Sequence, residues 1–94
     1  MSRSSPLPQV DLHGLRPEAA LRRLAQELHS ARVRGAAEIR VITGQGWGNR
    51  LQEPKLRTTV ESWLAGPEGR RAGARGSRRE AHGGALLVQL QRGS

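Results

Sequence analysis

The chain has 94 residues, no cysteine, and sixteen Lys and Arg against eight Asp and Glu, for a formal net charge of +8. This length allows one small domain with a two-layer core, and the absence of thiols excludes disulfides and thiolate metal sites. Fifteen of the sixteen bases are arginine, which is typical of proteins that bind phosphate or other polyanions, although high-GC codon usage would enrich Arg, Ala and Gly together and explains the charge equally well.

Apolar residues are sparse and give no membrane signal. Trp47 and Trp63 are the two aromatic residues, which are too few for a platform that stacks single-stranded bases. No apolar run approaches the ~20 residues that a membrane span needs, and no signal-peptide pattern is present. We expect a monomeric, cytoplasmic protein that does not bind membranes.

The N-terminal part predicts a disordered segment over residues 1–8 and a first strand over residues 9–13. Within that strand the apolar Val10 and Leu12 alternate with Asp11 and His13, so Asp11 and His13 share the face away from the core. A carboxylate beside an imidazole can set its tautomer, as in a general base with an orienting partner. A solvated polar face on an edge strand is the alternative interpretation.

A helix and a second strand follow. Pro17 suits the first helical position, Gly35 ends the helix, and residues 38–42 form a strand rich in β-branched side chains. The expected apolar stripe of the helix consists of Leu21, Leu24, Ala25, Leu28 and Ala31. A strand–helix–strand unit of this length makes a right-handed crossover between parallel strands, so both strands end at the same edge of the sheet. We therefore expect Asp11 and His13 to meet the residues after the second strand.

Those residues form a glycine-rich turn, Thr43-Gly44-Gln45-Gly46-Trp47-Gly48. Glycines between a strand and a helix permit positive φ and let a phosphate approach free backbone amides. The turn lacks the last glycine of a dinucleotide-binding fingerprint and the Gly-Lys-Ser/Thr ending of a P-loop, so an ordinary glycine turn is the alternative. Trp47 is either a stacking residue or a buried structural one. The basic residues that flank the turn either contact phosphates or are solvated side chains at the start of a helix. They are Arg50, Lys55 and Arg57.

The C-terminal half predicts a second helix from Pro54, ended by Gly66-Pro67, and a final strand over residues 85–90. The apolar face of the helix is Leu56, Val60, Trp63 and Leu64. Residues 68–80 contain almost no side chain able to anchor a core, so they predict a flexible loop or a very poor edge strand. His82, just before the final strand, predicts a turn with a secondary contact at the site.

Together these segments resemble the Smr domain, the small MutS-related family. The resemblance covers roughly residues 10–92, and relatives usually have a hydrophobic third strand where this chain has residues 68–80. The matching segments are Val10-Asp11-Leu12-His13-Gly14-Leu15, Pro17-Glu18-Ala19-Ala20, Thr43-Gly44-Gln45-Gly46, Leu56-Arg57 and His82-Gly83-Gly84-Ala85.

The resemblance implies an α/β two-layer sandwich of order β-α-β-α-β-β, similar to the C-terminal domain of translation initiation factor three. It would occupy residues 9–92, with 93–94 as a tail. It also implies nucleic-acid binding, often with endonuclease activity on DNA or on messenger RNA at stalled ribosomes. Asp11 and His13 match the family's Asp-x-His residues, which the resemblance implies are catalytic, and Thr43 to Gly46 match the family's Thr-Gly-x-Gly loop. The predicted binding residues are Thr43, Gly44, Gln45, Gly46, Trp47, Arg50, Lys55 and His82.

Three functions remain open: a phosphodiesterase on RNA or DNA, a nucleic-acid or ribosome binding module without turnover, and an interaction domain whose charge is compositional. Two-metal nucleases gather several carboxylates, whereas here Asp11 stands at the site with Glu53 a distant second. We therefore predict no metal site and no cofactor, with a divalent ion left open. Metal-free cleavage is easier on RNA because the 2′-hydroxyl is an internal nucleophile. RNA is the preferred substrate, and DNA nicking is the runner-up.

Overall fold

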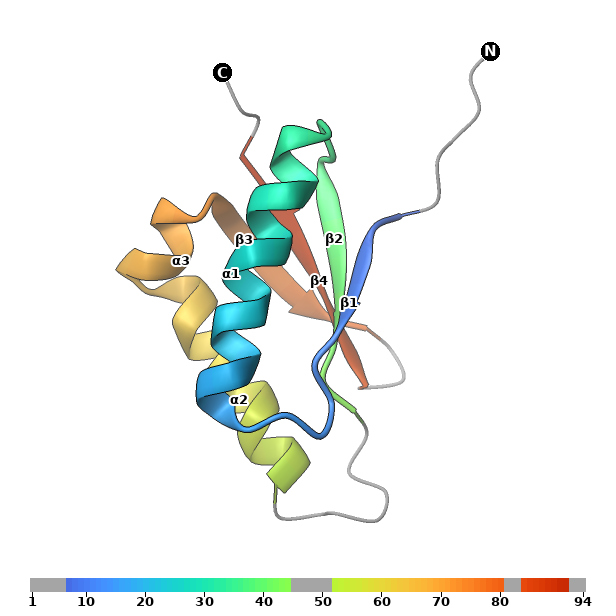
Figure 1. Ribbon diagram of the computed structural model, residues 1–94, viewed down its shortest axis with the longest axis vertical. Coiled ribbons are helices and arrows are strands. Elements are labelled where there is room, and N and C mark those ends of the chain that lie inside the picture. The colour runs from blue at the N-terminus through green and yellow to red at the C-terminus, as the bar shows by residue number, and fades with distance from the viewer. Residues whose placement is uncertain (1–6, 45–51, 81–83, 92–94) are drawn as a thin grey trace.

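A computed structural model describes residues 7–44, 52–80 and 84–91, and four strands in these ranges form one sheet. The sheet order is β1-β2-β4-β3, with β1 parallel to β2 and β4 antiparallel to both of its neighbours. All described helices lie on the same side of this sheet (Figure 1). In chain order the elements are β1 (Gln9–Asp11), α1 (Pro17–Val33), β2 (Glu38–Ile42), α2 (Gln52–Ala65), α3 (Pro67–Arg71), β3 (Ala74–Arg79) and β4 (Ala85–Leu90).

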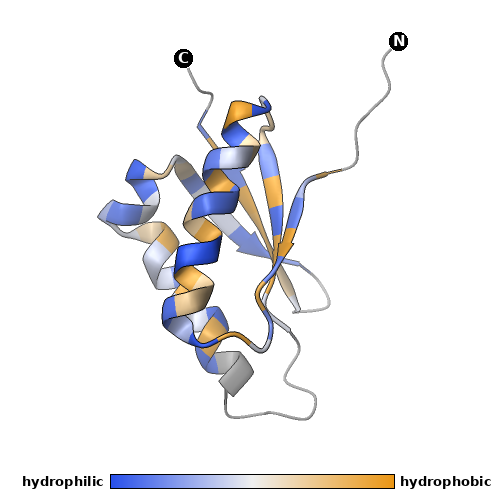
Figure 2. Ribbon diagram, in the orientation of Figure 1, coloured by the Kyte–Doolittle hydropathy of each residue, from blue (hydrophilic) through white to orange (hydrophobic). Residues whose placement is uncertain are grey.

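The core lies between the helices and one face of the sheet. Ile39 and Val41 of β2 are paired in register with Val88 and Leu86 of β4, and all four are buried. The alternation of polar and apolar residues along β2, visible in Figure 2, is what gives the sheet one core face and one open face. The buried residues that α1 contributes are Ala20, Leu24, Leu28 and Ala31.

The structure confirms the second and final strands at their predicted bounds, and the parallel pairing of the first two strands. The first strand is shorter than predicted, because its ladder with β2 ends at Asp11. The second helix begins at Gln52 rather than Pro54. In α1 the buried stripe includes Ala20, while Leu21 and Ala25 are half-buried at its side.

The prediction of a flexible loop over residues 68–80 is wrong. Gly66 and Pro67 end α2 as predicted, but Pro67 immediately begins α3, where its fixed φ and missing amide are tolerated. The edge strand that was the alternative is present as β3, which pairs along its length with β4 although Ala74 is its one buried residue. Backbone hydrogen bonds to a strongly apolar neighbour therefore hold a strand whose own side chains are nearly all exposed.

The ends of β1 and β2 and the start of β4 lie at one end of the sheet (Figure 1). The amide of Leu12, just after β1, donates to the carbonyl of Ile42 at the end of β2, at 2.7 Å. The amides of Thr43 and Gly44 both donate to the carbonyl of Gly84, just before β4, at 3.0 Å each. The residues that follow β1, those that follow β2 and the residue before β4 are thus adjacent. The parallel crossover predicted that the ends of β1 and β2 would lie together. Within the described ranges, no helix is long and apolar enough to cross a membrane.

Candidate active site at the end of the parallel strands

Asp11 and His13 are held in place by the residue between them. Leu12 is completely buried and its amide is bonded to Ile42, so the backbone on either side of it is fixed to the sheet. The side chains of Asp11 and His13 then project away from the core, with 53% and 57% of their surfaces exposed. The alternation of the sequence thus places both functional groups in solvent, at the edge where β1 and β2 end.

The two side chains are in direct contact. His13 Nδ1 lies 2.6 Å from Asp11 Oδ1, and the backbone amide of His13 donates to the same oxygen at 3.1 Å. A carboxylate that accepts from the residue two positions later forms a tight local turn, which fixes the orientation of both groups. When Nδ1 carries the hydrogen, the lone pair of the neutral imidazole resides on Nε2, the atom suited to accept a proton.

The electrostatics favour an ionised Asp11. Partial desolvation raises the pKa of the carboxyl group, but the side-chain hydrogen bond from His13, its backbone hydrogen bond and its charge lower it by more, and the pKa lies below the ordinary value of 3.8. Asp11 is therefore a carboxylate at neutral pH. A carboxylate in this position holds the imidazole in one tautomer and stabilises the imidazolium that forms when Nε2 takes a proton.

Lys55 lies at the same end of the molecule. A hollow of about 340 Å³ is bounded by residues 14–18, which join β1 to the start of α1, and by Lys55 and Leu56 of α2. Gly14, with φ of +80°, makes the turn that leads from His13 into this hollow. Of the predicted binding residues outside the glycine turn, Lys55 thus lines the same hollow as Gly14, the residue after His13.

The start of the glycine turn is occupied with internal contacts. Thr43 is completely buried, and its hydroxyl has no hydrogen-bond partner among the described residues. The amides of Thr43 and Gly44 are both used by Gly84, and Gly44 has a φ of +95° that favours glycine. These two amides are therefore not available to an anion, and Thr43 contributes to the joint between β2 and β4. An anion at this turn would have to bind beyond Gly44.

Several predicted site residues lie outside the described residues, namely Gln45, Gly46, Trp47, Arg50 and His82. Among the residues that are described, no group of three His, Asp or Glu side chains gathers as a metal site would require. Trp63, predicted in the core, is half-buried at its border, where its Nε1 donates to Glu68 Oε1 at 2.9 Å.

Two contacts near the site were not predicted from the sequence. One is the Gly84 carbonyl, which accepts hydrogen bonds from the amides of both Thr43 and Gly44. In the sequence, the glycines before the last strand are the one feature that could have indicated this close approach. The other is an ion pair across the open sheet face, in which Arg40 Nε and Nη2 each lie 3.0 Å from a carboxylate oxygen of Glu80. Both join segments about 40 residues apart, and spacing along the chain does not reveal such pairings.

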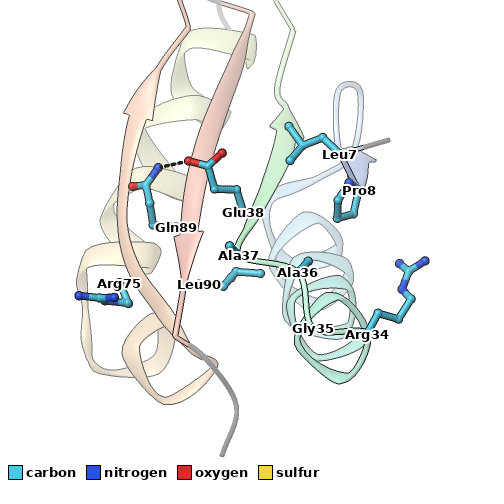
Figure 3. A pocket seen from close by; sticks show the side chains of 10 residues that line it. All are labelled: Leu7, Pro8, Arg34, Gly35, Ala36, Ala37, Glu38, Arg75, Gln89 and Leu90. Carbon is cyan, nitrogen blue, oxygen red and sulfur yellow. Dashed lines mark hydrogen bonds between the residues drawn. The ribbon is translucent and has the colours of Figure 1, made fainter. Parts of the chain in front are cut away.

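A larger hollow lies elsewhere. It measures about 740 Å³ and lies where β2 begins and β4 ends, at the other end of the sheet from Asp11 (Figure 3). Arg34 and Arg75 stand at its two sides, and within it Gln89 donates to Glu38 Oε2 at 3.2 Å. None of the residues predicted to act in catalysis or binding lines it. Hollow size alone therefore does not identify the site.

A family profile and two solved structures match this chain over most of its length. The Smr domain family profile matches residues 10–91. The Smr domain of Thermus thermophilus MutS2 is similar with a TM-score of 0.71 and 27% identity, over 90% of this chain and 99% of that chain. The SMR domain of NEDD4-binding protein 2 is similar with a TM-score of 0.66 and 28% identity, over 100% of this chain and 96% of that chain. No curated protein sequence is significantly similar to the chain.

Proposed function

The chain belongs to the Smr domain family, and from this premise we propose that it binds nucleic acid and cleaves phosphodiester bonds, with RNA as the preferred substrate. The observation that carries the proposal is the 2.6 Å contact between His13 Nδ1 and Asp11 Oδ1. It gives an exposed imidazole an ionised partner at the end of β1, and Lys55 of α2 lines the hollow that begins at the next residue, Gly14. The net charge of +8 supports a polyanionic substrate.

The proposed reaction uses the 2′-hydroxyl of RNA as the nucleophile. His13 Nε2 takes the proton of that hydroxyl while O2′ attacks the adjacent phosphorus. The bond from phosphorus to O5′ breaks, and O5′ takes a proton from solvent, which leaves a 2′,3′-cyclic phosphate and a 5′-hydroxyl end. Asp11 orients the imidazole and stabilises its charged form. In this proposal Lys55 binds a substrate phosphate.

The test is cleavage of end-labelled RNA by the wild-type protein and by His13→Ala. We expect His13→Ala to lower the cleavage rate by roughly 10²–10⁴-fold, the usual contribution of a general base, with unchanged circular dichroism. His29→Ala is the matched control, because His29 is an exposed histidine on α1, and it should cleave at the wild-type rate. RNA with 2′-O-methyl groups should resist cleavage.

The other outcomes decide between the alternatives. Nicking of DNA by the wild-type protein that is lost in His13→Ala would replace the RNA mechanism by one with water as the nucleophile. Binding without cleavage of either polymer, with and without added divalent metal, would leave a binding module. Undiminished cleavage by folded His13→Ala would remove His13 from the mechanism.

A further inference from the structure

The hollow between residues 14–18 and the start of α2 has chemistry that the fold does not use. Leu15 lies at its side with 38% of its surface exposed, although it is an apolar residue in a chain with few of them. Pro17 adds a second exposed apolar surface. Arg16 and Lys55 add two positive charges, and neither forms an ion pair with a described residue. Among the side chains that the structure describes, Glu18 is the single acid on the lining.

This combination matches one unit of a nucleic acid. A nucleotide has a flat, weakly polar base that packs on apolar side chains, and a phosphate that cations hold. The volume of about 340 Å³ is near the lower limit of ligand pockets, which measure roughly 300–1,000 Å³, so the hollow suits one small unit rather than an extended segment.

The hollow lies next to the Asp11–His13 pair. Gly14, which lines it, directly follows His13, and consecutive Cα atoms are about 3.8 Å apart. A phosphodiester at His13 and a group in the hollow are thus close enough to belong to neighbouring units of one strand. The larger hollow at the other end of the sheet has no such relation to His13.

We propose that this hollow is the subsite for the nucleotide next to the scissile phosphate, with its base against Leu15 and Pro17 and its phosphate between Arg16 and Lys55. This inference rests on the proposed function. It assigns Leu15 and Arg16 a binding role that neither spacing nor the family resemblance gave them. Arg16 acts on affinity through charge, and Leu15 acts through contact with the base.

The experiment measures affinity of the full chain for two ligands by fluorescence anisotropy at several salt concentrations. One ligand is a 2′-O-methyl RNA oligonucleotide, and the other is a sugar-phosphate oligomer of the same length without bases. Arg16→Gln should weaken both by about 3–10-fold and reduce the slope of log affinity against log salt by about 0.7. Leu15→Ser should weaken only the ligand with bases and leave the salt slope unchanged. Arg22→Gln, the same charge change at an exposed position of α1 outside the hollow, should stay within about twofold of wild type.

Each contrary result identifies what fails. If Arg16→Gln behaves like Arg22→Gln, or if Leu15→Ser weakens the base-free ligand equally, the subsite is overturned while the proposed function stands on wild-type binding and cleavage. Polyglutamate is a third ligand in the same assay; if Arg16→Gln and Leu15→Ser weaken its binding as much as they weaken RNA binding, the occupant is an acidic protein segment and the inference is overturned. Absence of wild-type binding to any oligonucleotide would overturn the proposed function and the subsite together. Circular dichroism melts confirm that the variants fold.

Discussion

At the scale of single residues, the low pKa of Asp11 depends on His13. Desolvation alone raises that pKa, and the two hydrogen bonds and the charge of His13 reverse the effect. We expect His13→Ala to raise the pKa of Asp11, because the side-chain bond and the charge disappear while the backbone amide and the desolvation stay. The measurement is a nuclear magnetic resonance titration of the Asp11 carboxyl carbon.

The same pKa gives the sign of the pH dependence of stability. Because folding lowers the pKa of Asp11, its contribution to the free energy of unfolding is present above the unfolded pKa and is lost as pH falls through the folded pKa. His13→Ala should show a weaker loss over that acidic range. In the control variant His29→Ala, the pKa of Asp11 and the loss of stability at acidic pH should match those of the wild type. An Asp11 pKa that is unchanged in His13→Ala would show that the contact does not persist in solution.

The site residues that could be predicted are those whose positions follow from local spacing. Alternation of apolar and polar residues from Val10 to His13 places Asp11 and His13 on the same exposed side, and Gly14 makes the turn that follows them. The role of Thr43 could not be predicted in this way, because its burial and its amide bond to Gly84 depend on a strand more than forty residues later. Because of this long-range pairing, Thr43 is part of the joint between β2 and β4 and not the predicted ligand contact.

At the scale of elements, the short helix α3 packs against the end of α2 through a glycine. Gly69 is buried, and a Cβ at this position would overlap the carbonyl oxygens of Trp63 and Leu64. These are backbone atoms, so they cannot move aside as a flexible side chain would. We expect Gly69→Ala to lower the free energy of unfolding by about 2–3 kcal/mol, as overpacking of a close contact does. Chemical denaturation measures the effect.

The control for this change is Gly76→Ala on the edge strand β3. A Cβ at Gly76 would meet only the Gln89 side chain at 3.5 Å, an ordinary contact, and the residue is exposed. Its effect should stay within about 0.5 kcal/mol. Equal stability of the two variants would mean that α3 does not lie against α2 as described.

The elements with strong local signals were predictable, and those without them were not. The stripe of α1 and the apolar strands β2 and β4 carry their periodicity in their own residues. In contrast, β3 has one buried residue, and its order comes from pairing with β4 and from Arg79, whose Nε lies 2.8 Å from Glu61 Oε2 on α2. That ion pair lowers the pKa of Glu61 chiefly through the hydrogen bond from Arg79. Glu61 lies 18 residues before Arg79, so the residues of β3 alone give no signal for this pairing.

At the scale of the whole molecule, positive charge is spread over both ends of the sheet. Arg16 and Lys55 lie at the end that carries His13, whereas Arg34 and Arg75 lie at the other end. Ion pairs such as that of Arg40 with Glu80 neutralise part of the surface between them. Long-range attraction therefore draws a polyanion to the molecule as a whole, and only contacts at one end hold it against His13.

This distribution predicts how affinity depends on salt. The two cations at the His13 end, Arg16 and Lys55, make about two phosphate contacts, which on a single strand give a slope of log affinity against log salt near −1.4, so raising salt from 50 to 200 mM should weaken binding roughly 7-fold. Lys55→Gln removes a contact at the His13 end and should reduce the slope by about 0.7. Arg34→Gln removes the same charge at the far end and should leave the slope close to wild type. Affinity that is flat in salt, or equal slopes for the two variants, would show that binding is not organised by phosphate contacts at the end of the parallel strands.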